Sequence, residues 1–196
     1  DSIVLMARSL DALLDEPAFL VGFSMGAIIA AEAARQAPAQ IAGLGLVAFN
    51  ATADLPERAA VRPLQQQRVR AGELESIVAD ELKPNYLAAI NCTNQALRDT
   101  VMAMAQELGP AVFIAQSEAL RQRGDLRPAL GGFTMPVLLA CGTEDRLCPP
   151  QWHRDWARMT GPHATFVEIP GAGHLLPLEQ PAALAEALLG WLKQEA

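Results

Sequence analysis

The sequence has no apolar run approaching the roughly 20 residues that a helix needs to cross a bilayer. It also has no basic segment followed by an apolar stretch and a small-residue cleavage site. Positive charge is scarce: 15 Lys and Arg stand against 22 Asp and Glu, a net charge of −7, and no Lys/Arg cluster is present. Because a surface that tracks phosphates needs such a cluster, the sequence argues against nucleic acid as well as membrane partners.

Cysteine is also sparse. Cys92, Cys141 and Cys148 are odd in number and form no C-x-x-C pair, which is typical of a reducing compartment and predicts a cytoplasmic location. No His/Cys/carboxylate group has metal-ligand spacing, and no Gly-x-Gly-x-x-Gly follows a predicted strand. No metal and no other cofactor is therefore expected. The sequence does not determine the oligomeric state, and a homo-oligomer is one of the possibilities.

What the sequence does contain is alternating apolar runs and helical stretches. Continuous apolar runs predict strands, the first of them typical of a strand buried on both faces, at residues 18–23, 44–49, 136–141 and 164–169. Helical patterns fall at residues 25–37, 151–159 and 181–193, and an N-terminal helix has an apolar face of Ile3, Met6, Leu10, Leu13 and Leu14. Alternation of this kind predicts an α/β fold with a parallel sheet covered on both sides.

Residues 52–134 break the alternation. They show helical periodicity, abundant Gln, Arg and Ala, and no convincing strand. An insertion between two strands at the C-terminal edge of a sheet would cover the site there as a lid. We therefore predict core segments at residues 1–51 and 135–196 and a helical cap at residues 52–134.

The pattern Gly22-Phe23-Ser24-Met25-Gly26 lies where a strand ends and a helix begins. A turn this tight needs glycines beside the serine, so that Ser24 projects outward as a nucleophile. The backbone N–H of Met25, at the helix N-terminus, would then stabilise an oxyanion.

A serine hydroxyl needs a base, and the base needs a carboxylate. His174 follows the last predicted strand and is the candidate base, because that position lies at the same sheet edge as Ser24. His153 and His163 lie in or beside a charged helix and are interpreted as surface residues. Asp145 follows the third strand and is the candidate acid, but spacing alone does not exclude its neighbour Glu144.

The order Ser24, Asp145, His174 is that of α/β-hydrolases. The motifs resemble that family directly: the serine pattern, the acid loop Gly142-Thr143-Glu144-Asp145, and Gly173-His174 followed by Leu178-Glu179-Gln180-Pro181. Within that family the sequence is most similar in character to members that act on small molecules and carry a helical cap, among them enol-lactonases, carboxylesterases and carbon–carbon bond hydrolases. The resemblance implies the C-terminal part of a mostly parallel sheet. It also implies earlier strands and a loop that gives the second oxyanion donor, and neither is found in this sequence. Because the chain opens at Asp1 without a methionine, we expect that an N-terminal part is missing.

These observations predict a serine hydrolase that cleaves a small ester, lactone or thioester through an acyl-enzyme. A carbon–carbon hydrolase, a perhydrolase or haloperoxidase, and a hydrolase-like domain that only binds a small ligand remain alternatives. Tyr86, Met102, Met104 and Phe113 are candidates for the substrate pocket, because Met and aromatic side chains adapt to apolar ligands. Trp152 and Trp156 are expected to pack against the sheet, and Cys148 to be structural.

Overall fold

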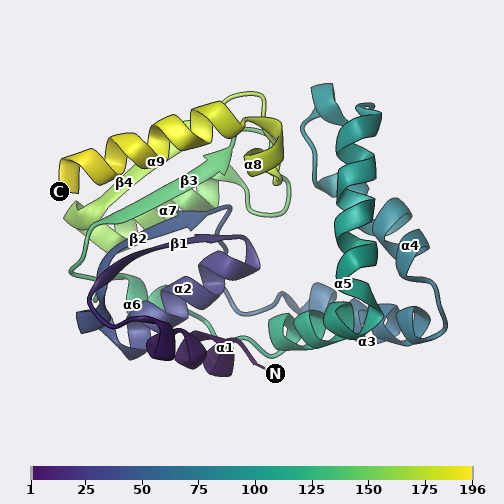
Figure 1. The fold of residues 1–196 in the computed structure, drawn as a ribbon, viewed down its shortest axis with the longest axis horizontal. Coiled ribbons are helices and arrows are strands. Elements are labelled where there is room, and N and C mark those ends of the chain that lie inside the picture. Colours follow the sequence, from purple (N-terminus) through teal and green to yellow (C-terminus); the bar gives the residue numbers. More distant parts are fainter. Residues whose placement is uncertain (1, 196) are drawn as a thin grey trace.

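The computed structural model describes residues 2–195 and contains a four-stranded parallel sheet in the order β1-β2-β3-β4 (Figure 1). The strands are β1 (Ala18–Phe23), β2 (Ile41–Val47), β3 (Val137–Gly142) and β4 (Ala164–Ile169). All four predicted strands are therefore present, with boundaries shifted by up to three residues. Because every strand runs the same way, their carboxyl ends meet at one edge of the sheet.

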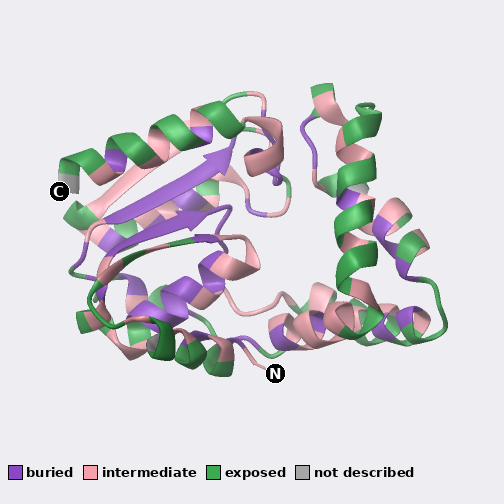
Figure 2. Cartoon of the chain, viewed as in Figure 1, coloured by how far each residue is buried: buried purple, intermediate pink, exposed green. Residues whose placement is uncertain are grey.

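Helices cover both faces of the sheet. On one face α2 (Met25–Gln36) and α7 (Pro150–Thr160) enclose the larger buried cluster, and α1 (Ile3–Leu10) packs against α2. On the other face α9 (Pro181–Glu195) packs on β3 and β4 and closes a second buried cluster. Figure 2 shows the result, with the buried central strands β2 and β3 between helices whose outer surfaces are exposed. The prediction of a parallel sheet covered on both sides is confirmed.

The expectation that residues 18–23 are buried on both faces is wrong. Within residues 2–195, β1 pairs with β2 alone, so it is an edge strand, and Phe19 and Val21 are 38% and 50% exposed. In contrast, every residue of β3 is buried. The apolar run of β1 reflected its strand character correctly but carried no information on its neighbours.

The N-terminal helix also ends earlier than predicted. After α1 the chain tightens into a 3₁₀ turn at Asp11–Leu13, and Leu13 is 74% exposed. A 3₁₀ turn advances about 120° per residue instead of 100°, so the apolar face that begins at Ile3 does not continue through Leu13. Leu14 returns to the core cluster.

Residues 52–134, called the helical insertion below, contain helices and no strand. The two long helices are α3 (Pro56–Arg70) and α5 (Gln95–Arg121), which pack against each other. The helix α5 bends at Gly109-Pro110, where Gly109 has φ 76°. Between them lie α4 (Leu74–Ser76), a π-helical turn at Ile77–Leu82 and 3₁₀ turns at Lys83–Asn85 and Ala89–Asn91, and α6 (Arg127–Leu130) follows α5.

His153 is not a surface residue as predicted. Its side chain is completely buried in α7, its Nε2 accepts a hydrogen bond from the Phe49 backbone N–H at 2.9 Å, and its ring stacks on Phe166. Burial lowers its pKa to about 4, so the ring is neutral at pH 7. The charged neighbours Arg154, Asp155 and Arg158 had suggested exposure, and their own side chains are indeed 41%, 42% and 70% exposed. His163 is exposed, as predicted.

Candidate active site

Ser24 lies at the junction of β1 and α2 in a conformation that few non-glycine residues adopt, with φ 51° and ψ −113°. Its backbone N–H donates to the Val47 carbonyl at 2.8 Å, which ties the turn to β2. A Cβ on Gly22 would lie 2.3 Å from the Gly26 carbonyl oxygen, so only glycine allows strand and helix to approach this closely. Strain of this kind costs on the order of 1–3 kcal/mol and is common at functional sites.

The side chains of Ser24, His174 and Asp145 form one hydrogen-bonded chain. His174 Nε2 lies 2.9 Å from Ser24 Oγ, and His174 Nδ1 lies 2.9 Å from Asp145 Oδ2. His174 and Asp145 are 4% and 3% exposed, so water does not compete for these contacts. The three sequence-predicted residues, up to 150 positions apart, thus meet at the carboxyl edge of the sheet.

The loop after β3, which carries both Glu144 and Asp145, shows which of the two carboxylates contacts His174. Asp145 Oδ1 accepts the backbone N–H groups of Leu147 and Cys148 at 2.9 and 2.8 Å, which leaves Oδ2 for His174. Glu144 instead accepts the backbone N–H of Ala89 at 2.9 Å. Asp145 is therefore the partner of the imidazole, while Glu144 binds the helical insertion.

The histidine loop is held by contacts that the sequence reading missed. The His174 backbone N–H donates to the Tyr86 carbonyl at 2.8 Å. Glu179 accepts the backbone N–H of Gly173 at 2.8 Å through one oxygen, and that of Ala88 at 2.7 Å through the other. Glu179 stood in a quoted motif, but nothing in its local pattern indicated a contact 91 residues away.

Met25 is the first residue of α2, so its backbone N–H has no acceptor within the helix. Together with the positive end of the helix dipole, this donor is suited to a negative oxygen beside Ser24. Phe23 and Tyr86 place their rings 5.5 and 6.0 Å from the imidazole of His174. Two aromatic rings therefore lie beside the imidazole.

A cavity of about 570 Å³ opens over this site and is lined by Ser24, Met25 and His174 together with residues of the helical insertion. A second cavity of about 270 Å³ lies within the insertion. The two share Arg62, Gln65, Leu82, Tyr86 and Leu120 as lining residues. The second cavity, lined mainly by apolar side chains, therefore adjoins the one over Ser24.

Three of the predicted pocket residues line these cavities. Tyr86 lines both, while Met104 and Phe113 line the second. Met102 lines neither and packs against the buried cluster of the insertion. Burial raises the pKa of the Tyr86 hydroxyl, so it is a neutral group at pH 7. Trp156 is buried in the core cluster and Trp152 packs against it, as predicted.

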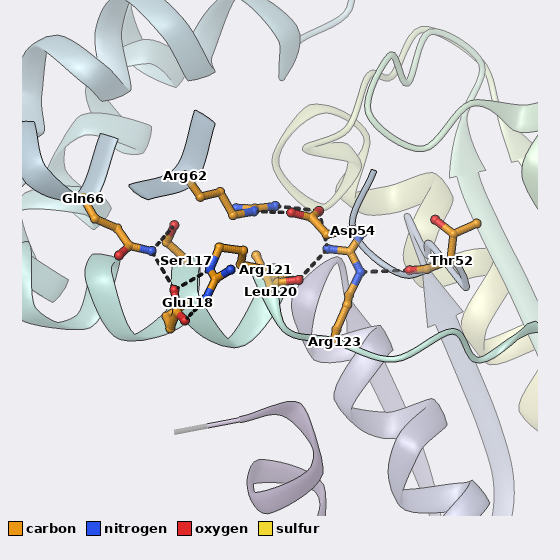
Figure 3. A network of polar contacts seen from close by, with 9 residues as sticks. All are labelled: Thr52, Asp54, Arg62, Gln66, Ser117, Glu118, Leu120, Arg121 and Arg123. Carbon is orange, nitrogen blue, oxygen red and sulfur yellow. Dashed lines mark hydrogen bonds and ion pairs between the residues drawn. The ribbon is translucent and has the colours of Figure 1, made fainter. Parts of the chain in front are cut away.

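An ion-pair network at the base of the insertion was not predicted at all (Figure 3). Asp54 accepts from Arg62 Nε at 2.6 Å and from Arg123 Nη1 at 2.8 Å, and Arg123 Nε donates to the Thr52 carbonyl at 2.9 Å. Asp54 and Arg123 have side chains only 1% and 4% exposed. The network joins the two segments that connect the insertion to the sheet.

Cys148 lies beside the same site. Its Sγ, an Asp145 carboxylate oxygen and a His174 ring nitrogen lie within 4.8 Å of one another, so they are the described residues that could share a metal ion. Burial raises the pKa of the Cys148 thiol well above its usual value, whereas metals bind the thiolate. Asp145 and His174 are also bonded to each other. The donor set therefore fits an acid–base pair better than a metal centre.

In residues 2–195, none of the helices combines the length and apolar character that crossing a membrane requires.

A parallel sheet that brings a serine, a histidine and an aspartate together at its carboxyl edge, under a helical insertion, defines a class of α/β proteins rather than a single activity. The chain belongs to the alpha/beta hydrolase family, whose model matches residues 3–187. The resemblance seen in the sequence motifs is thereby confirmed, and so is the fold that it implied.

Two relatives by sequence are matched over different shares of their own length. The chain is 32% identical to a pimeloyl-[acyl-carrier protein] methyl ester esterase of Xanthomonas oryzae pv. oryzae, with 88% of this chain and 69% of that protein aligned. It is 28% identical to the dihydrolipoyllysine-residue acetyltransferase component of an acetoin cleaving system in Pseudomonas putida. That match covers 96% of this chain, which spans 50% of the length of the Pseudomonas protein.

Solved structures give the same fold. A thermophilic esterase from Thermogutta terrifontis, solved with malate bound, superposes with a TM-score of 0.92 at 29% identity, over 100% of this chain and 73% of that one. An enol-lactonase from Burkholderia xenovorans LB400 superposes with a TM-score of 0.82 over 98% of this chain and 74% of that one. At 23% identity the second likeness shows the fold alone.

Proposed function

We propose that this chain carries the catalytic residues of a serine hydrolase that cleaves a small ester, lactone or thioester. The observation that carries the proposal is the chain of contacts from Ser24 Oγ through His174 to Asp145, at 2.9 Å on each side. That geometry allows proton transfer from the hydroxyl to the imidazole. The likeness to a methyl ester esterase and to a thermophilic esterase supports ester cleavage within the family.

In the first half of the reaction His174 Nε2 accepts the proton of Ser24 as Oγ attacks the carbonyl carbon. The Met25 N–H stabilises the resulting oxyanion, and Asp145 stabilises the imidazolium through Nδ1. The tetrahedral intermediate then collapses: His174 gives its proton to the departing alcohol or thiol, and an acyl group remains on Ser24.

In the second half His174 removes a proton from a water molecule, which attacks the acyl carbonyl. Collapse of that intermediate returns the proton to Ser24 and releases the carboxylic acid. The larger cavity has room for a small acyl chain at Ser24, and the adjoining cavity, with Met104 and Phe113 in its wall, suits an apolar arm of the substrate. In this mechanism residues 52–134 act as the cap of the site.

The test is covalent labelling with a fluorophosphonate probe, made on the full-length protein that carries this chain and followed by mass mapping of the labelled peptide. We expect label on Ser24, no label in Ser24→Ala, and labelling reduced at least about a hundredfold in His174→Ala, because an unactivated serine is a poor nucleophile. His163→Ala is the matched control and keeps full labelling. A folded protein without label at Ser24 would instead favour a domain that binds a small ligand without turning it over.

A further inference from the structure

The wall of the larger cavity carries more positive charge than the rest of the molecule would suggest. In a chain with a net charge of −7, this cavity is lined by four arginines, Arg58, Arg62, Arg123 and Arg146. Two carboxylates, Glu57 and Glu81, also line it, Asp54 pairs with Arg62 and Arg123, and Asp145 pairs with His174. Two arginines of the wall, Arg58 and Arg146, are left without a carboxylate partner among residues 2–195.

Two of these arginines have unused donors. Arg62 binds Asp54 through Nε and Nη2, and Arg123 uses Nε and Nη1. Arg62 Nη1 and Arg123 Nη2 have no hydrogen-bond partner among residues 2–195, although Arg123 is only 7% exposed. Burial lowers the pKa of Arg123, and Asp54 offsets that effect only in part. Both nitrogens are open to solvent rather than buried without a partner, so an anion in the cavity can bind them in place of water.

The other two arginines come from different parts of the fold. Arg58 is half-buried on α3 of the helical insertion, and Arg146 follows Asp145 in the acid loop. Neither forms an ion pair with another described residue. A guanidinium with no structural partner at the wall of a reaction cavity is free to bind substrate.

This group lies near the proposed nucleophile. Ser24, His174 and the four arginines line one and the same cavity of about 570 Å³. A ligand held by these arginines therefore occupies the cavity onto which Ser24 opens.

We propose that the cavity selects substrates with a free carboxylate a few atoms from the scissile carbonyl, bound by the arginines at positions 58, 62, 123 and 146. This inference rests on the proposed function for the identity of the reaction. A carboxylate supplies the negative partner that Arg58 and Arg146 lack, and its two oxygens match the planar guanidinium fork. The preferred substrates are half-esters of short dicarboxylic acids.

The kinetic test compares two matched series. One contains monomethyl succinate, glutarate and adipate, and the other contains the same methyl esters with a carboxamide in place of the carboxylate. At the best chain length, kcat/KM for the acid ester should exceed that for the amide ester by more than about tenfold. In Arg58→Gln or Arg146→Gln this ratio should fall about tenfold, the loss typical of one charged hydrogen bond. Arg70→Gln, an exposed position on the same helix, is the matched control and keeps the ratio.

Binding supplies a readout that does not need turnover. Succinate, glutarate and adipate are titrated by calorimetry into the wild type and into the Arg58→Gln/Arg146→Gln variant, with circular dichroism to show that both are folded. We expect at least about tenfold weaker binding in the variant and weaker binding to the wild type at high salt.

The outcomes distinguish the carboxylate site from the proposed hydrolase reaction. Hydrolysis of acid and amide esters at equal rates would overturn the carboxylate preference and leave the hydrolase intact. Dicarboxylate binding that depends on the two arginines, without turnover of any ester, would support the anion site and remove the proposed reaction. A wild type that neither binds dicarboxylates nor prefers acid esters would refute the site.

Discussion

His153 makes the stability of this protein depend on pH in a way that the structure allows us to calculate. Its ring is completely buried and accepts the Phe49 backbone N–H. The pKa is about 4 in the folded state, against an ordinary value of 6.5, chiefly because burial disfavours the charged ring. In the unfolded chain the ring is free to bind a proton at its ordinary pKa.

Because the folded-state pKa is the lower one, the unfolded state binds the proton more readily below pH 6.5. The contribution of neutral His153 to the free energy of unfolding is therefore complete above pH 6.5 and is lost as the pH falls toward 4. One pKa unit corresponds to about 1.4 kcal/mol, so His153 alone should reduce the free energy of unfolding by about 2 kcal/mol between pH 7.5 and pH 5.

The assay is urea denaturation at pH 7.5 and pH 5.0 on the wild type and on His153→Gln, whose amide oxygen can still accept from Phe49. The variant loses the titrating group. The drop in its free energy of unfolding from pH 7.5 to pH 5.0 should therefore be about 2 kcal/mol smaller than that of the wild type. His163→Gln, at the exposed histidine, controls for the general effect of removing an imidazole. An equal loss of stability in the wild type and His153→Gln would refute the reasoning, because other groups would then carry the pH dependence.

Gly22→Ala should destabilise the fold by about 3 kcal/mol, because the new Cβ would lie 2.3 Å from the Gly26 carbonyl oxygen; a thermal melt within a degree of wild type would contradict this. Gly124→Ala, where a Cβ meets no atom within 4 Å, is the control. Asp145→Asn should lower kcat by roughly 10³–10⁴-fold, whereas Glu144→Gln should stay within about tenfold of wild type, since Glu144 contacts only backbone of the insertion. The reverse order of effects would reassign the acid.

Much of the site was predictable from sequence because its signals are local. A strand, a turn that only glycine permits and a helix are adjacent in the chain, so Ser24 is evident from one short stretch. His174 follows from its position after the last strand, because all parallel strands of a sheet end at one edge. The same local patterns determined the α/β class and the helical character of residues 52–134, whereas the division into core and cap remains an interpretation.

Tertiary structure decided everything that depends on neighbours distant in the chain. Asp145 rather than Glu144 meets the imidazole because the backbone of Leu147 and Cys148 turns one carboxylate inward while the insertion binds the other. His153 is buried because Phe49, 104 residues earlier, offers it a donor.

The arginine-lined cavity is the clearest case. Arg62 and Arg123 are far apart in sequence and meet only at Asp54. Periodicity and motifs report the conformation of short segments, while burial, pairing and charge balance arise only when those segments pack together. The sequence by itself therefore determined the class of fold and the candidate nucleophile and base. The tertiary structure decided which carboxylate contacts the imidazole and which side chains line the cavity around it.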